Sequence, residues 1–221
     1  PSNASKLYKE NNIKTIEDLK NIYKINNKII NSKQAIGLIH YDDLQERIPR
    51  EEMDAWRDIL SDIFLETLKE LNINGTIELA GSYRRGKPDS GDIDILITTD
   101  FYNPLLMQTY YNNLIKYKII TRTNTISNGP VKIMVVGKID DLFRHIDIFY
   151  YEKEIYPFAL LFTTGSKEFN VSLRAHAIKN GYSLNERNLT HISSGRTVLP
   201  EEYLIKIEKP LPETEEDIFN F

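Results

Sequence analysis

The sequence contains no cysteine among its 221 residues. A chain without thiols has no disulfide framework, no thiolate metal site and no cysteine nucleophile, which fits an intracellular protein. It also lacks any run of about 18 to 20 uncharged apolar residues, the length that a membrane-spanning helix needs. Its start does not show the charged and then apolar pattern of a signal peptide. We therefore expect a soluble, intracellular protein with no membrane partner.

A surplus of basic residues is missing as well. The formal net charge is -4, from 28 Lys and Arg against 32 Asp and Glu. Proteins that coat nucleic acid usually carry a basic surplus, because they neutralise many phosphates. Any nucleic-acid binding must therefore come from local patches. Arg84, Arg85 and Lys87 form one such patch, although a solvated surface explains this cluster equally well when it is taken alone.

Apolar residues recur with two different periods along the chain. Residues 1–48 show short helical patterns separated by Asn- and Lys-rich turns, and 49–71 form one long amphipathic helical pattern. After Asn74-Gly75 the spacing becomes that of strands. The expected strands lie around 77–79 and at 93–97, 119–122, 131–136 and 145–150, with a helix at 104–116.

The last part of the chain returns to a helical pattern over 155–181. It ends in short extended pieces, which we expect at 183–184, 197–199 and around Ile205. Together these patterns predict an α+β fold. Its parts are a helical N-terminal lobe (1–48), a central lobe with a mixed β-sheet (49–153) and a C-terminal α/β lobe (154–221).

Acidic and aliphatic residues alternate in the run Asp92-Ile93-Asp94-Ile95. Side chains two apart on a strand share a face, roughly 6.6 Å apart, so both acids face one way while the isoleucines enter the core. Ile146-Asp147-Ile148 repeats the pattern with one acid. If the two strands pair, three carboxylates meet and repel one another unless hard divalent cations such as Mg²⁺ compensate their charge. Taken alone, acids on an exposed sheet face are more often simply solvated.

A glycine-serine turn precedes these acids. The expected strand at Glu78-Leu79-Ala80 runs into Gly81-Ser82, eleven residues before Asp92. Such a turn exposes backbone N–H groups and a hydroxyl at a helix start, where the dipole favours anions. Arg85 adds a guanidinium suited to phosphate oxygens. A lone Gly-Ser pair usually makes only a turn, but beside three acids it indicates a triphosphate site of the nucleotidyltransferase superfamily.

Seven stretches, in one order along the chain, resemble the polymerase beta-like X family of DNA polymerases. They are residues 46–53 (ERIPREEM), 81–86 (GSYRRG), 90–94 (SGDID), 145–148 (HIDI), 164–166 (TGS), 174–177 (RAHA) and 217–219 (DIF). The resemblance implies a catalytic palm at 49–153 and a nucleotide-selecting C-terminal lobe at 154–221. The opening residues resemble the second half of a helix-hairpin-helix element that binds DNA. We therefore expect a fragment that lacks the family's N-terminal lyase domain.

The resemblance also assigns roles to individual residues. Asp92 and Asp94 are expected to bind two Mg²⁺ ions, with Mn²⁺ as an alternative ion, and Asp147 to bind the catalytic metal and help deprotonate the primer 3′-hydroxyl. Arg174 is expected to contact DNA in the minor groove, near the new base pair. The residues expected to contact the incoming nucleotide are Arg47, Ser82, Arg85, Gly91, Phe162, Gly165, Lys167 and Asn170.

Several positions depart from the family pattern, among them the segment 162–165, where only Phe162 is aromatic and the family usually has two aromatic residues. Lys167 replaces an acid that usually touches the incoming base, and a charged residue there also fits a merely solvated helix face. His145 stands where an arginine often supports the third aspartate, and either a structural or a tuning role fits it. Phe149 replaces a second arginine that bridges to the metal-binding acids in relatives.

We expect a template-directed, DNA-repairing polymerase that adds dNMP from a dNTP to a primer 3′-hydroxyl on gapped or primer-template DNA. The chain is expected to be monomeric, with a nucleus or a viral replication site as candidate locations. The alternatives are a template-independent terminal transferase, a nucleotidyltransferase acting on RNA or a small molecule, and an inactive scaffold that binds DNA ends. Terminal transferases carry a long loop before the third aspartate, where this chain has only 137–144.

Overall fold

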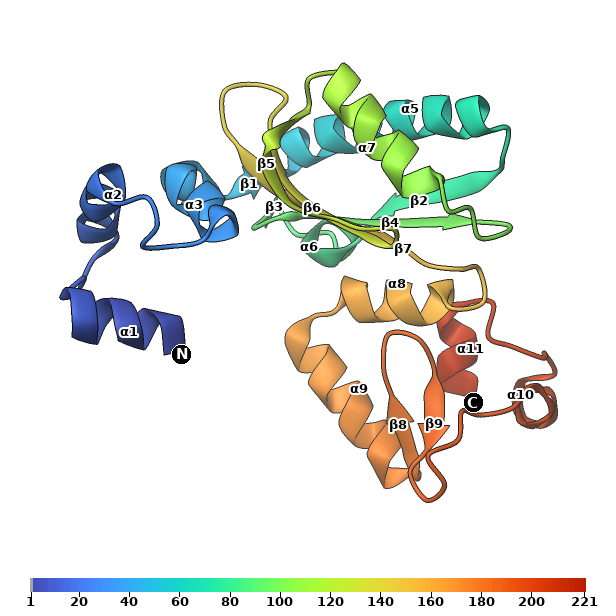
Figure 1. The fold of residues 1–221 in the computed structure, drawn as a ribbon. Helices are drawn as coiled ribbons and strands as arrows, with labels where there is room; N and C mark the ends of the chain where they lie inside the picture. Colours follow the sequence, from blue (N-terminus) through green and yellow to red (C-terminus); the bar gives the residue numbers. More distant parts are fainter. Residues whose placement is uncertain (1) are drawn as a thin grey trace.

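The computed structural model describes residues 2–221 (Figure 1). Four short helices come first: α1 (Ser2–Asn11), α2 (Ile16–Ile25), α3 (Ser32–Ile39) and α4 (Tyr41–Gln45). Thr15 and Asn31 begin α2 and α3 with capping boxes, in which side chains satisfy N–H groups that the first helical turn leaves free. Ile30, Ala35 and Leu38 form the small core of this region.

A five-stranded mixed sheet follows, in the order β2-β4-β7-β6-β5. The strands β4 and β7 are parallel, and the other neighbouring pairs are antiparallel. This arrangement confirms the predicted mixed sheet. The strands are β2 (Gly75–Leu79), β4 (Ile93–Thr99), β5 (Ile120–Asn128), β6 (Lys132–Gly137) and β7 (Arg144–Tyr150).

Helices α5 (Arg50–Leu71) and α7 (Leu106–Lys116) cover one face of this sheet (Figure 1). Ile93 and Ile95 of β4 point to that face and are fully buried against Trp56 and other residues of α5 and α7. The opposite face carries Asp94 and then Leu96, because strand side chains alternate. Leu96 packs on helix α8 (Tyr156–Thr164), so that Asp94 lies just beyond the apolar contact.

The C-terminal region begins with α8 (Tyr156–Thr164), which lies between the sheet and the rest of this region (Figure 1). Phe158, Leu161, Tyr203 and Ile218 belong to its core. The further elements are α9 (Lys167–Lys179), β8 (Tyr182–Leu184), β9 (Leu189–His191), α10 (Pro200–Ile207) and α11 (Glu215–Asn220).

The extended segment predicted around Ile205 is wrong, because that residue lies in helix α10. Pro200 stands in the first helical turn, where its missing N–H costs nothing. The carboxylate of Glu202 accepts a hydrogen bond from the Leu199 N–H, which closes the helix start. These local signals outweigh the β-branched residues of the segment.

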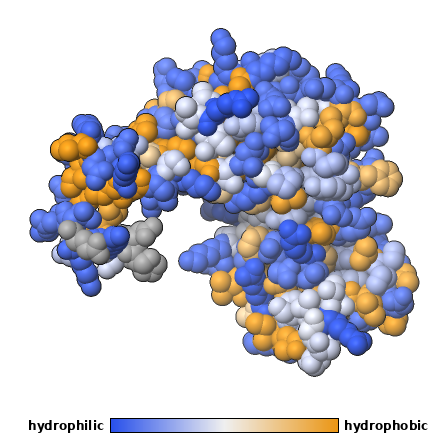
Figure 2. Space-filling view, in the orientation of Figure 1, coloured by the Kyte–Doolittle hydropathy of each residue, from blue (hydrophilic) through white to orange (hydrophobic). Residues whose placement is uncertain are grey.

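Figure 2 shows the N-terminal helices at the left and the C-terminal region at the lower right, with an open space between them. Two small strands, β1 (Ile48–Pro49) and β3 (Asp89–Ser90), pair beside the sheet, and the one-turn helix α6 (Gly81–Arg84) follows β2. Among the described residues, no helix combines the length and the apolar character that crossing a membrane requires.

Candidate active site

Asp94 and Asp147 occupy directly paired positions on the parallel strands β4 and β7. Paired residues point to the same face of a sheet, so both carboxylates rise from one patch. Asp92 lies two residues before Asp94, exposed and immediately before β4. The structure therefore brings together the three acids that the sequence singles out.

These three carboxylates are electrostatically coupled. Burial, followed by the charges of Asp92 and Asp147, raises the pKa of Asp94 from 3.8 to about 7, although Lys132 and Arg85 oppose the rise. Negative groups that repel one another in a half-buried place favour either protonation or a bound cation. The patch therefore has the electrostatics of a cation site.

The two carboxylate oxygens of Asp147 have different surroundings. Its Oδ2 lies 3.4 Å from Nζ of Lys132, and its Oδ1 lies 3.8 Å from Nε2 of His145. Among the described residues Oδ1 is a buried oxygen that lacks a hydrogen-bond partner. A hard divalent cation fits this donor set, because it prefers carboxylate oxygens and would satisfy the orphaned one. Within residues 2–221, however, no three acidic or histidine side chains already form a metal-ligand group.

Gly81 brings the turn after β2 against the acids. The Ala80 N–H donates to the backbone oxygen of Asp94, at 2.9 Å. The φ angle of Gly81 is +56°, and a Cβ there would lie 2.5 Å from Oδ2 of Asp94. Only glycine tolerates both that left-handed conformation and that proximity. The glycine therefore lets the turn approach the carboxylates.

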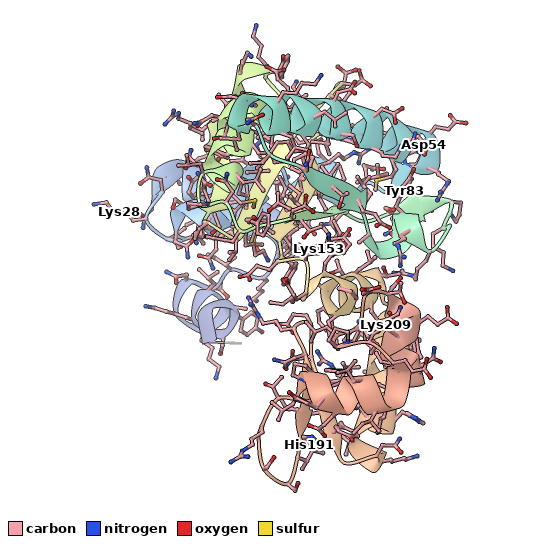
Figure 3. All side chains as sticks on the ribbon, turned by 90° about the vertical axis from the view of Figure 1, so that its right-hand side faces the viewer. Lys28, Asp54, Tyr83, Lys153, His191 and Lys209 are labelled. Carbon is pink, nitrogen blue, oxygen red and sulfur yellow. The ribbon has the colours of Figure 1, made fainter. Side chains whose placement is uncertain are left out.

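Helix α6, which carries Ser82, is anchored by side chains of α5. The Tyr83 hydroxyl donates to Asp54 at 2.5 Å and accepts from Arg57 at 2.9 Å, and Figure 3 shows Asp54 and Tyr83 near each other. The Arg50 guanidinium stacks on the Tyr83 ring, 4.5 Å from its centre. These contacts fix a four-residue helix that is too short to be stable alone.

Ser82, in the turn after β2, donates a hydrogen bond from its hydroxyl to the Ser90 hydroxyl at 2.8 Å. Arg47 reaches the same place from the β1 side, where its Nη2 donates to Oδ1 of Asp89 at 2.6 Å. A Cβ on Gly91 would lie 2.9 Å from Nη1 of Arg47, so the glycine leaves room for the guanidinium. The hydroxyl and the cation therefore stand beside the start of β4.

The opposite wall comes from the junction of α8 and α9. Ser166 caps α9, and Nδ2 of Asn170 donates to the Phe162 backbone oxygen at 2.8 Å. The Arg174 guanidinium lies 4.9 Å from the centre of the Phe162 ring. Arg85 crosses from the turn and donates to the Thr164 backbone oxygen. Both walls are therefore linked through Arg85.

These walls enclose a cleft of about 640 Å³. It contains every residue predicted for the site except Asp147, which stands beside Asp94 on the next strand. The cleft is lined by Arg47, Gly81, Ser82, Arg85, Gly91, Asp92, Asp94, Phe162, Thr163, Gly165, Ser166, Lys167, Asn170, Val171 and Arg174.

Sequence reasoning missed a buried ion pair behind the site. The side chain of Arg144 is 2% exposed and donates two hydrogen bonds to the Glu52 carboxylate, at 2.7 and 2.6 Å. It also donates to the Glu46 backbone oxygen at 2.9 Å. Arg144 begins β7 three residues before Asp147, and Glu46 precedes Arg47. No local pattern announces this pair, because its partners lie 92 residues apart.

Lys132 was missed for a different reason. The predicted strand 131–136 contains it, and the period of two places it on the face that Met134 shares with Asp147. The sequence therefore indicates which face Lys132 occupies. To predict its contact with Asp147, the register between β6 and β7 must also be known. That register appears only in the structure.

Two family models match the chain. The DNA polymerase beta palm model matches residues 47–153, and the DNA polymerase beta thumb model matches residues 159–221. DNA polymerase lambda of Arabidopsis thaliana is 30% identical over 236 residues, covering 100% of this chain and 42% of that protein. The DNA nucleotidylexotransferase of Xenopus laevis is 25% identical over 201 residues, covering 74% of this chain and 38% of that protein.

A solved structure agrees with these matches. The crystal structure of Leishmania infantum polymerase beta in a ternary P/T complex superposes with a TM-score of 0.80 at 26% identity, over 98% of this chain and 87% of that one. The chain spans less than half the length of the two curated relatives. Because the palm and thumb models match in chain order and leave out only residues 1–46 and 154–158, the chain belongs to the X family of DNA polymerases.

Proposed function

We propose that this chain is the catalytic part of a template-directed DNA polymerase that fills gaps during repair. The reaction is attack of a primer 3′-hydroxyl on the α-phosphate of a dNTP, which forms the new phosphodiester and releases pyrophosphate. The observation that carries the proposal is the meeting of Asp92, Asp94 and Asp147 beside the Gly81 turn. The family membership and its relatives named DNA polymerase lambda support it.

The metal site of this proposal is the acid patch. Asp92, Asp94 and Asp147 would hold two Mg²⁺ ions, with Mn²⁺ as a substitute, since their oxygens suit hard cations. When bound, these ions would stabilise the charge on the attacking and leaving oxygens. Asp147 would also help remove the proton of the primer hydroxyl, since its Oδ1 is free of hydrogen-bond partners within residues 2–221.

The remaining cleft residues would bind and orient the dNTP. Ser82, Arg85 and Arg47 present a hydroxyl and two guanidinium groups, which suit triphosphate oxygens. Positioning and charge compensation supply most of the catalysis in such a site.

The α8–α9 wall would receive the sugar and the base. Phe162 and Gly165 face the cleft from the end of α8, and Lys167 and Asn170 face it from α9. Arg174 stands one turn further along α9, where a base pair and its minor groove would lie. In the proposed division of labour, residues 1–48 bind DNA, 49–153 carry the chemistry and 154–221 select the nucleotide.

A template-independent transferase is the second candidate, because one relative of the chain is named DNA nucleotidylexotransferase. The connection between β6 and β7, just before Asp147, favours template dependence. It comprises only residues 138–143, whereas terminal transferases carry a long loop there.

Primer extension on gapped DNA, on an open primer-template and on single-stranded DNA tests the function. We expect incorporation only opposite a template and only with Mg²⁺ or Mn²⁺, from a monomeric protein. Asp94→Asn and Asp147→Asn should each reduce the rate by at least about a hundredfold. Tailing of single strands would favour the transferase. DNA binding without extension would leave an end-binding scaffold as the function.

A further inference from the structure

Lys132 stands next to the three acids, although it lies on a different strand. It begins β6, opposite Phe149 of β7, and Met134 is opposite Asp147. Lys132 and Asp147 are therefore diagonal neighbours on one face of the sheet, a separation that a lysine side chain can span. Its Nζ lies 3.4 Å from Oδ2 of Asp147 and 4.5 Å from the centre of the Phe149 ring.

The two partners of this ion pair differ in exposure. The side chain of Asp147 is 16% exposed and is fixed on a central strand, whereas that of Lys132 is 39% exposed. A lysine ammonium is a compact, strongly hydrated charge on a flexible stem. Lys132 can therefore swing into solvent without disturbing the sheet, while Asp147 stays in place.

Other cations near the acids are engaged elsewhere. Arg85 donates to the Thr164 backbone oxygen, and Arg144 is held by Glu52. His145 approaches Asp147 only to 3.8 Å. Among the described residues, Lys132 is thus the lysine whose ammonium pairs with one of the three acids.

We propose that Lys132 is a built-in counter-cation that competes with the divalent metal for Asp147. In the metal-free protein its ammonium neutralises Oδ2, and it must leave this oxygen before a metal can take it. Lys132 is then a positioning residue that lowers the metal affinity of the site. Without metal, its charge reduces the repulsion among the three carboxylates and so stabilises the fold. This inference rests on the proposed metal site.

Direct metal binding tests the competition. We expect Lys132→Gln to tighten Mn²⁺ binding, measured by electron paramagnetic resonance of free Mn²⁺, by roughly 3- to 10-fold, because a half-exposed ion pair no longer has to be broken. Lys132→Met, which keeps the apolar stem against Phe149, should give the same gain. Lys132→Arg keeps the charge and should bind Mn²⁺ as the natural chain does.

Thermal unfolding supplies a second measurement. Without metal, Lys132→Gln should melt at a lower temperature than the natural chain, because the acids lose their internal counter-charge. Mn²⁺ should then raise its melting temperature by more, since stabilisation by a ligand grows with affinity. Neither measurement depends on polymerase activity.

Lys138 offers a matched control. It follows β6, and its Nζ lies 5.1 Å from the centre of the Phe143 ring. Lys138→Gln therefore removes one charge and one aromatic contact of the same kind, and it should leave Mn²⁺ affinity unchanged. In an Asp147→Asn background, Lys132→Gln should add nothing, as expected of two residues that act through one contact.

The outcomes separate this inference from the function. Equal Mn²⁺ affinity in the natural chain and in the Lys132→Gln and Lys132→Met variants would overturn the competition and leave the metal site standing. A gain in Lys132→Arg as large as in the neutral variants would also overturn it, because packing rather than charge would then be responsible. If the natural chain binds no Mn²⁺ that Asp94→Asn removes, the proposed metal site and the inference both fail.

Discussion

Two structural features require glycine at position 81: a left-handed backbone conformation and close contact with the Asp94 carboxylate. Gly86, which ends the same turn, shares only the first feature. Its φ angle is +75°, and a Cβ added there would meet nothing within 4 Å. The two glycines therefore separate the cost of the backbone conformation from the cost of proximity to Asp94.

Alanine at each glycine tests that separation. Gly81→Ala and Gly86→Ala should both lose about 1 kcal/mol of unfolding free energy in urea titrations, the cost of a left-handed alanine. Gly81→Ala should in addition displace Asp94, reducing primer extension by at least about a hundredfold. Gly86→Ala should extend primers at nearly the natural rate. Equal losses of activity would mean that the turn, and not its contact with Asp94, is what matters.

For individual residues, the sequence predicted which face of a strand a side chain occupies better than which side chains it contacts. Alternation along 92–95 and 146–148 placed the three acids on one face, because the period of a strand is a local property. The pairing of Asp94 with Asp147 stayed conditional, and the contact of Lys132 with Asp147 was missed. Both depend on which strands become neighbours, which is decided by long-range packing.

Helix α6 links the elements on both sides of the cleft. Arg84 donates to Glu78 of β2, to the Thr164 hydroxyl at the end of α8 and to Glu215 at the start of α11. The Arg84 Nη2 to Glu215 Oε2 distance is 2.6 Å, and both side chains are mostly covered. Arg84 therefore joins the turn proposed to bind phosphates to the C-terminal region.

Breaking this link should weaken nucleotide binding. Glu215→Gln should raise the KM for dNTP by roughly fivefold, the equivalent of a partly covered ion pair of about 1 kcal/mol, with a smaller change in kcat. Steady-state primer extension at varied dNTP concentration measures both constants. Glu216→Gln, in the same helical turn but exposed, is the control and should change neither. A fall in kcat alone would contradict a role in nucleotide binding.

Elements with strong periodicity were predicted well, and short ones only in part. The long helix expected over 49–71 is α5, Arg50–Leu71, because Trp56, Leu60 and Phe64 repeat at helical spacing. Ile205, in contrast, was expected in an extended piece. An eight-residue helix such as α10 has too few turns to show a period, so its capping contacts decide its structure.

The Arg144–Glu52 pair joins the start of β7 to a segment that lies more than 90 residues earlier in the sequence. It connects the start of β7 to α5 and, through the Glu46 oxygen, to the segment that carries Arg47. The sequence predicted an α+β fold, and the structure confirms it. It did not predict how the parts are joined, because a buried ion pair has no periodic pattern.

Removing the negative charge from this pair should destabilise the whole molecule. Glu52→Gln leaves the Arg144 guanidinium buried without its counter-charge, which should lower the free energy of unfolding by about 3 kcal/mol. Urea unfolding followed by circular dichroism measures the loss. The neighbouring Glu51 is exposed, so Glu51→Gln should change stability by less than about 0.5 kcal/mol. Comparable losses in the two variants would show that the pair contributes nothing specific.

The parallel pairing of β4 with β7 has a consequence for the newly made chain. Parallel strands cannot be joined by a tight hairpin, and here the crossover from one to the other includes α7, β5 and β6. A ribosome must therefore synthesise this entire excursion before Asp147 can reach Asp94. Contacts of such high sequence separation form late and slowly. The appearance of tight Mn²⁺ binding would thus report when the sheet is fully assembled. A stalled chain that ends before β7 would not bind the ion tightly.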